Sequence, residues 1–404
     1  RRWRGDEGIF LMDFSPTEEQ RLLVATIRAF VDDELRPLEA RIEETGHLAD
    51  DIAAEIRAKS QALGLYALNI PTEYGGGGLP VLDWMIAEEQ FGRTSDILIR
   101  RAFGNVYEIL LEGTDAQIET YLLPAVRGAR TFSVAFTEPA AGSDAAAITT
   151  RAVRKGDGWV LNGAKHFISD GLYSDFFIVT AVTDPDAGAH GISTFILDKG
   201  RPGFSVGRDQ PMMGLRGTSH VEMRFENVEL DEGCLLGQEG QGLKLALATL
   251  GRVRLAQVAA RAVGKASMIL DDCLDHARNR RQFGSAIGEF QLIQQMLADS
   301  AMEINACRLA LWQTASRIDA GDEARGAISM LKVQASEMLG RVVDRAVQIY
   351  GGAGYCRDLP IERYYRDARI ARIYDGTSEI HRMVMARQMM RGDVGLFDIY
   401  EQVR

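Results

Sequence analysis

Apolar residues recur at helical spacing along the first third of the chain. After the stretch "SPTEEQ", four of them share one helical face: Leu22, Leu23, Ile27 and Phe30. This is the pattern of an amphipathic helix packed on a core. Ser15, Pro16 and Glu18 suit the N-cap, the first helical position and the capping box, so the helix is expected to begin there. Similar patterns predict further helices over 50–63, 81–91 and 105–112.

The pattern changes near residue 130, where short runs rich in β-branched and aromatic residues begin. Clusters of Gly, Pro and Asp separate these runs, which is typical of strands and their turns. The runs cover 131–136, 159–169, 175–183, 191–198 and 221–230. The sequence therefore predicts a β domain inserted between helical regions.

Helical spacing returns after Gly242 in much longer segments. They are rich in Ala, Leu, Met and Arg, and they cover 243–279, 289–319 and 325–350. A last helix is expected to begin near Thr377, with Ile380, Met383 and Val384 on its inner face. Long helices with short connections indicate an antiparallel bundle.

These patterns predict an α+β fold in three parts. A helical domain is expected at 13–129, a β-sheet or barrel domain at 130–241, and an antiparallel four-helix bundle at 242–404. Residues 1–12 lack the apolar run of a signal peptide and are expected to form an extension outside this fold, without fixed structure. A chain of 404 residues is long enough for several domains.

Composition excludes several classes of function. The net charge of −11 argues against a general nucleic-acid binder, because no basic excess exists to neutralise phosphates. The four cysteines have no CxxC spacing and predict neither a zinc site nor a disulfide framework. They are Cys234, Cys273, Cys307 and Cys356. No apolar run is long enough to predict a membrane span.

Two stretches offer groups that could act chemically. "FTEPAAGSD" at 136–144 combines hydroxyls with small residues that let a ligand approach the backbone, although an ordinary loop has the same composition. "RIYDGTSEIHR" at 372–382 places Asp375 between a tyrosine and a glycine. Locally, Asp375 is equally well explained as a turn residue before a helix cap.

Five motifs together resemble those of the acyl-CoA dehydrogenase family. They are "FTEPAAGSD", "NGAKHFISDG" at 162–171, "RRQFG" at 280–284, "QIYGGAGY" at 348–355 and "RDARIARIYDGTSEIHR" at 366–382. They occur in the family's order and at similar spacings across residues 13–392. One such motif would be weak support, whereas five in order are strong. The family's helical–β–helical architecture also agrees with the periodicity.

The resemblance implies FAD as the cofactor. On the flavin side it points to Phe136, Thr137, Gly142, Ser143, Phe167, Ile168 and Ser169, and near the last helix to Thr377 and Glu379. Phe167 stands where the family usually has tryptophan, and Ser169 where a threonine normally reaches the flavin N5 edge. The pyrophosphate and adenosine side is implied to be completed by a neighbouring subunit, in a homotetramer or dimer. Its residues are Arg280, Phe283, Gln291, Gln348, Gly351 and Gly352.

The resemblance also assigns the substrate and the base. Ser143 and Arg254 match positions beside coenzyme A, and Tyr374 and Gly376 match positions that touch the thioester. Asp375 aligns with the family's catalytic base, which is typically glutamate. Some members carry the base on the first long C-terminal helix instead, but 243–270 contains no acidic residue. Aspartate is shorter than glutamate by ~1.5 Å of reach.

Three rival functions remain open at this point. The chain could be an oxidase that resembles nitroalkane oxidase, which uses aspartate as its base, a flavin monooxygenase of the same fold, or a non-catalytic flavin-binding member. A dehydrogenase would resemble family members that pass electrons to an electron-transferring flavoprotein. The resemblance implies a cytoplasmic enzyme, or one of the mitochondrial matrix in a eukaryote.

The segment 93–105 matches the region that lines the acyl pocket in the family. Asp96, Arg100 and Arg101 are unexpected beside a simple alkyl tail. One hypothesis is a polar-ended, branched or cyclic acyl group, and the alternative is that these charges face solvent.

Overall fold

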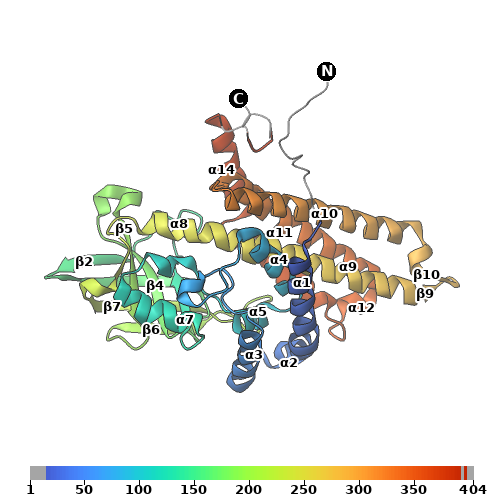
Figure 1. Cartoon of the computed structure of the whole chain (residues 1–404), viewed down its shortest axis with the longest axis horizontal. Coiled ribbons are helices and arrows are strands. Elements are labelled where there is room, and N and C mark those ends of the chain that lie inside the picture. Colours follow the sequence, from blue (N-terminus) through green and yellow to red (C-terminus); the bar gives the residue numbers. More distant parts are fainter. Residues whose placement is uncertain (1–14, 393–394, 398–404) are drawn as a thin grey trace.

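The protein is described by a computed structural model that covers residues 15–392 and 395–397. Helices come first, a sheet follows, and longer helices complete the chain (Figure 1). The sheet lies at one end of an elongated molecule, and α8 extends from it toward the helical end. The predicted extension at 1–12 lies outside the described residues. The domain boundaries after residues 129 and 241 stay predictions.

The N-terminal part is built from short helices. They are α1 (Glu18–Phe30), α2 (Glu39–Thr45), α3 (Asp50–Ala62), α4 (Val81–Phe91), α5 (Asp96–Phe103), α6 (Asp115–Gln117) and α7 (Leu123–Val126). The cap predicted at Ser15 is wrong by two residues. Thr17 caps α1, because its hydroxyl accepts from the Gln20 N–H and the Gln20 side chain accepts from the Thr17 N–H. The helix predicted at 105–112 is only a 3₁₀ turn over Glu108–Glu112.

The middle part is an eight-stranded sheet with the order β6-β7-β3-β2-β4-β5-β8, and β1 pairs in parallel with β4. Its strands are β1 (Phe132–Ala135), β2 (Arg151–Lys155), β3 (Gly158–Ser169), β4 (Phe176–Val182), β5 (Ile192–Asp198), β6 (Phe204–Asp209), β7 (His220–Leu230) and β8 (Leu235–Leu236). The five predicted runs all contain strands. The polar strands β2 and β6 escaped prediction because only Ala152 is buried in β2 and no residue is buried in β6.

The C-terminal part is a bundle of long helices. Its elements are α8 (Gly242–Val253), α9 (Arg261–Asn279), β9 (Arg281–Gln282), β10 (Ser285–Ala286), α10 (Gln291–Asp319), α11 (Arg325–Tyr350), α12 (Gly352–Tyr355), α13 (Ile361–Arg369) and α14 (Ser378–Met390). A π-helical segment, Arg254–Ala260, joins α8 to α9. The helix predicted at 243–279 is therefore continuous but widened in its middle. Within the described residues, none of the helices combines the length and the apolar character needed to cross a membrane.

The inner face predicted for the last helix is wrong. Ser378 and His381 are the buried residues of α14, whereas the Met383 side chain is 39% exposed. The helix turns this polar face inward because it begins at the turn that contains Asp375, and His381 contacts that turn.

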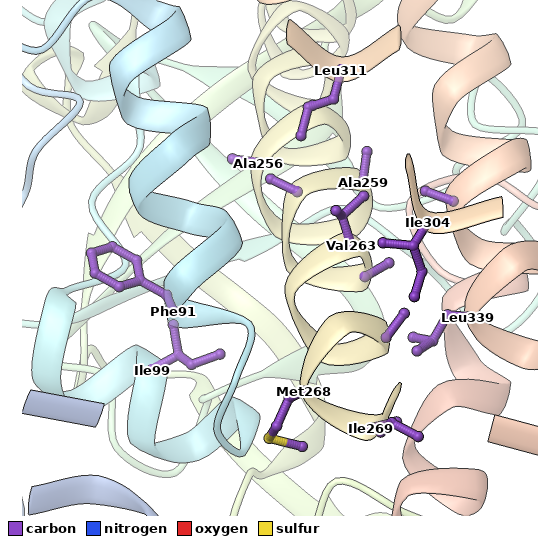
Figure 2. Close-up of a cluster of buried hydrophobic side chains, with 14 of the residues drawn as sticks. Phe91, Ile99, Ala256, Ala259, Val263, Met268, Ile269, Ile304, Leu311 and Leu339 are labelled. Carbon is purple, nitrogen blue, oxygen red and sulfur yellow. The ribbon is translucent and has the colours of Figure 1, made fainter. Parts of the chain in front are cut away.

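One apolar core joins the first and last parts. Figure 2 shows Ala256, Ala259 and Val263 on the central helix, between helices on both sides. Phe91 and Ile99 come from the N-terminal helices, and Ile304, Leu311 and Leu339 come from α10 and α11. The small alanine side chains let these helices approach closely. This packing fixes α5 against the bundle.

Candidate active site

The ends of β1 and β3 bring two groups of predicted flavin contacts together. The His166 N–H donates to the Thr137 carbonyl at 2.9 Å, and the Lys165 Nζ donates to the Phe136 carbonyl at 3.0 Å. Residues 136–137 and 167–169 are therefore neighbours in space as well as in the predicted site. Gly142 and Ser143 follow in the exposed loop after β1.

Phe167 presents its ring outward from a distorted strand. Its φ of 58° lies in the left-handed region, and the register of β3 against β7 shifts between Lys165 and Ile168. Such a backbone is costly for an aromatic residue and persists only where surrounding contacts hold it. The ring stacks on His166 at 3.9 Å, yet the residue remains 55% exposed. A planar ligand could therefore stack here, whereas the Ile168 side chain packs into the sheet core.

A buried ion pair holds the loop after β1. Lys165 donates to Glu138 at 2.9 Å, and Glu138 also accepts from the N–H groups of Thr149 and Thr150. Burial opposes ionisation of Glu138. The charge of Lys165 and these hydrogen bonds outweigh it and lower the pKa of Glu138 to about 2. Sequence analysis missed both residues, although each lies inside a quoted motif.

We expect Glu138→Gln to destabilise the protein by about 3 kcal/mol at neutral pH, because Lys165 would stay buried without its counter-charge. The pKa of Glu138 is below its ordinary value, so its stabilisation is present above about pH 4.5 and is lost as the pH falls toward 2. Urea unfolding of the flavin-bound protein at several pH values measures this. The exposed Glu229, paired with Lys155, gives the matched control Glu229→Gln. Identical pH dependence of wild type and Glu138→Gln would contradict the prediction.

The turn before α14 holds Asp375 in a constrained conformation. Its φ of 54° is left-handed, and its carbonyl accepts from the Arg254 Nε at 2.7 Å and lies 3.1 Å from the His381 Nε2. The next carbonyl, that of Gly376, accepts from the Lys332 Nζ at 2.6 Å. A Cβ at Gly376, where φ is 93°, would lie 2.8 Å from the His381 ring. Three helical segments therefore fix this turn.

The carboxylate of Asp375 is left free by these contacts. Among the described residues it makes no hydrogen bond and no ion pair. Burial raises the pKa of Asp375 above its ordinary value, although the charges of Arg254 and Lys332 oppose the shift. Within the same part of the chain, the N–H groups of Asp375 and Gly376 donate to no other residue. The turn thus combines a free carboxylate with two free donors.

A network of charges on α5 links this helix to the end of β3. Arg100 is 8% exposed and pairs with Asp96 and, at 3.0 Å, with Asp170, which follows Ser169 at the end of β3. The charge of Arg100 also lowers the pKa of Asp375, and that of Asp96 raises it. The interpretation that the charges of this segment face solvent is wrong for Arg100.

The predicted adenosine-side residues lie at the far end of the bundle. Arg280 ends α9, Phe283 is 97% exposed in the β9–β10 hairpin, and Gln291 begins α10. The ends of α9 and α11 meet, because the His276 and Tyr350 rings stack at 4.0 Å. This contact brings Gln348, Gly351 and Gly352 to the same end. Within one chain this end is remote from the sheet (Figure 1).

The remaining predicted residues lie at or near the turn. The Thr377 hydroxyl accepts from the Ile380 N–H and caps α14, and Glu379 is exposed in its first turn. Tyr374 is partly buried, and burial raises the pKa of its hydroxyl. The Nε of Arg254 donates to the Asp375 carbonyl. The predicted role of Arg254 beside coenzyme A stays a prediction.

Known protein domains match three segments that together cover most of the described residues. The N-terminal, middle and C-terminal domains of "Acyl-CoA dehydrogenase" match residues 17–129, 133–228 and 240–390. The acyl-CoA dehydrogenase of Bacillus subtilis (strain 168) is 36% identical over 380 residues, which cover 93% of this chain and 99% of that protein.

Two solved structures have the same fold. Butyryl-CoA dehydrogenase from Megasphaera elsdenii superposes with a TM-score of 0.87 at 34% identity, and the match covers 94% of this chain and 100% of that one. The structure of PigA with FAD and proline superposes with a TM-score of 0.85 at 27% identity, covering 94% and 99% of the two chains.

Proposed function

This chain belongs to the acyl-CoA dehydrogenase family, and from that premise we propose that it introduces an α,β double bond into an acyl-CoA thioester, with Asp375 as the base. The observation that carries the proposal is the Asp375 turn. Its carboxylate is free of partners among the described residues, and its pKa is raised. A turn residue that served only to cap the helix would not need three helical segments to hold it.

The chemistry requires a base and a polarised carbonyl. The α C–H of a thioester is a weak acid, so a base with a raised pKa accepts its proton more readily. The unused N–H groups of Asp375 and Gly376 are suited to bind the thioester oxygen, where negative charge develops. Because both donors and the base belong to one clamped turn, their relative positions are fixed before substrate binds.

The residues on the sheet side fit a flavin. The exposed ring of Phe167 offers a stacking face, and the loop from Phe136 to Ser143 is held by the buried Glu138–Lys165 pair. Phe136, Thr137, Gly142, Ser143, Phe167 and Ser169 would hold the flavin half of FAD. When bound, FAD supplies the acceptor for the hydride that leaves the β carbon.

A second copy of the chain is part of this proposal. The predicted adenosine-side residues lie around the β9–β10 hairpin, at the end of the molecule away from the sheet that carries Phe167 and Ser169 (Figure 1). A single FAD that used both sets would therefore bridge two chains, as in a homodimer or homotetramer. An electron-transferring flavoprotein as electron acceptor and a cytoplasmic location belong to the same proposal and rest on the family resemblance.

Product analysis tests the proposed reaction. The purified protein is incubated with a panel of acyl-CoAs and an artificial electron acceptor, and products are identified by mass. Loss of two hydrogens from the acyl group supports the dehydrogenase. Oxygen consumption with nitroalkanes, and no reaction with any acyl-CoA, would support the oxidase alternative.

We expect a preference for compact or polar acyl groups. Asp96, Arg100 and the partly buried Tyr107 interact electrostatically with Asp375, and a long alkyl chain packed against these groups would leave them poorly solvated. In the same panel, kcat/KM for short or polar acyl-CoAs should exceed that for a long-chain acyl-CoA by about tenfold or more. Equal values for all chain lengths would contradict this expectation.

A further inference from the structure

Lys332 is a fully buried lysine in the middle of α11. It is 0% exposed, and the one hydrogen bond of its side chain among the described residues joins its Nζ to the Gly376 carbonyl. Burying an ammonium group is costly unless it is well paired. Burial indeed lowers the pKa of Lys332 to about 8, against the opposing effect of Asp375. Among the buried residues of α11, Lys332 is the one that carries a charge, so its burial calls for a function.

The contact made by Lys332 completes a clamp on the Asp375 turn. Arg254 and His381 hold the Asp375 carbonyl, and Lys332 holds the next one. A left-handed backbone at a residue other than glycine costs about 1 kcal/mol or more, so outside contacts must maintain it. Lys332 reaches the turn from α11, on which α14 packs.

Lys332 also acts on the Asp375 carboxylate through its positive charge. The groups that act on it are Asp375 on the turn, Arg254 on the π-helical segment, Glu379 on α14 and Glu337 on its own helix. Asp375 itself is acted on by Arg254, Lys332, Arg100 and Asp96. Burial lowers the pKa of His381 to about 4, so its ring is neutral at pH 7. Arg254 and Lys332 are thus the two cations of the clamp. Arginine stays protonated at any pH at which the enzyme is assayed, whereas Lys332 loses its proton near pH 8.

We propose that Lys332 is a positioning residue for the dehydrogenation: it fixes the Asp375–Gly376 turn for the short carboxylate, and its charge favours the ionised base. This inference rests on the proposed function of Asp375. It explains how an aspartate can serve where reach is limited, because a misplacement of about 1 Å can cost on the order of 10²-fold in rate.

The test uses two variants that separate the hydrogen bond from the charge. Lys332→Met removes both, whereas Lys332→Gln keeps a donor without the charge. We expect Lys332→Met to lower kcat by about 10²-fold. Both variants should move the acidic limb of the kcat–pH profile upward by about one pH unit, because Asp375 loses a nearby positive charge. Lys332→Gln should recover part of the lost kcat.

Lys265 supplies the matched control. It is a partly buried lysine whose pKa burial also lowers, its Nζ donates to the Thr94 carbonyl at 2.7 Å, and it is not among the described groups that act on the pKa of Asp375. Lys265→Met should reduce stability without moving the acidic limb. Flavin content and unfolding midpoints are measured for every variant, so that a loss of fold is not mistaken for a loss of positioning.

The outcomes separate this inference from the proposed function. An active wild type, an inactive Asp375→Asn variant and Lys332 variants with an unmoved acidic limb would overturn only the role of Lys332. Lys332 variants that both lose flavin and unfold would also overturn it, in favour of a purely structural lysine. A wild type inactive toward every acyl-CoA would overturn both proposals.

Discussion

Asp375→Asn is expected to slow flavin reduction by an acyl-CoA by about 10²- to 10⁴-fold, the usual contribution of a general base. Asparagine has nearly the same shape as aspartate but cannot accept the α proton. Arg254 and His381 contact the main-chain carbonyl of residue 375, so the clamp should remain intact in the variant. Bound flavin should therefore stay at its wild-type level. Stopped-flow absorbance under anaerobic conditions measures the rate.

Asp375→Glu is the control for this variant. It keeps a carboxylate, but its extra reach of ~1.5 Å moves the base away from the position that the clamp sets for aspartate, so we expect a rate between those of wild type and Asp375→Asn. Wild-type rates in Asp375→Asn would show that the base lies elsewhere. The described residues offer no obvious substitute on the preceding long helix, since 243–270 contains no acidic residue.

Arg100→Ala is expected to lower the free energy of unfolding by about 3–5 kcal/mol, because it strips a counter-charge from buried carboxylates. Among the residues that the structure describes, Asp170 would then keep Arg101 at 3.6 Å as its one ion-pair partner, and Asp96 would keep Arg261 at 3.6 Å. Since Asp170 directly follows β3, the loss would loosen the junction between the sheet and α5. Urea unfolding of the flavin-bound protein measures the change.

Two further variants make this result specific. Arg278→Ala removes an exposed pair with Asp275 and should leave stability unchanged. The double variant Arg100→Leu, Asp170→Leu should recover part of the loss, because the Asp170 carboxylate is then no longer buried without Arg100, while Asp96 keeps Arg261. A loss below about 1 kcal/mol in the free energy of unfolding of Arg100→Ala would contradict the account.

The same variant tests the hypothesis of a polar acyl group. If such a group contacts Arg100, Arg100→Ala should selectively weaken the binding of polar acyl-CoAs. Equal effects on all acyl chains would remove that hypothesis.

The pattern of apolar residues predicted many elements well because those residues are buried, as in α4, buried from Trp84 to Phe91, and in β5, buried over 192–197. The helix expected at 81–91 is α4, and the run at 191–198 contains β5. Polar edge strands gave no such signal, as β2 and β6 show. The face of α14 was mispredicted because its buried residues are a serine and a histidine that serve the neighbouring turn, and apolar periodicity does not register them.

The candidate site could be predicted only where local motifs carry it. Asp375 was identified from its motif, but its clamp was not, because the donors come from distant parts of the chain. Arg254 is 121 residues from Asp375, and Lys332 is 44 residues from Gly376. Likewise, the sequence could not place Arg100 in the interior, since its partner Asp170 is 70 residues away. Such pairings depend on tertiary structure, which a local pattern does not contain.

Anaerobic titration of the purified wild-type protein with acyl-CoAs tests the central claim most directly. The visible absorbance band of the oxidised flavin is followed after each addition of a thioester. The account predicts that at least one acyl-CoA bleaches this band, and that the same acyl-CoA leaves it unchanged on the same timescale in Asp375→Asn. A flavin that stays oxidised in wild type with every acyl-CoA, or that bleaches equally fast in Asp375→Asn, would contradict it.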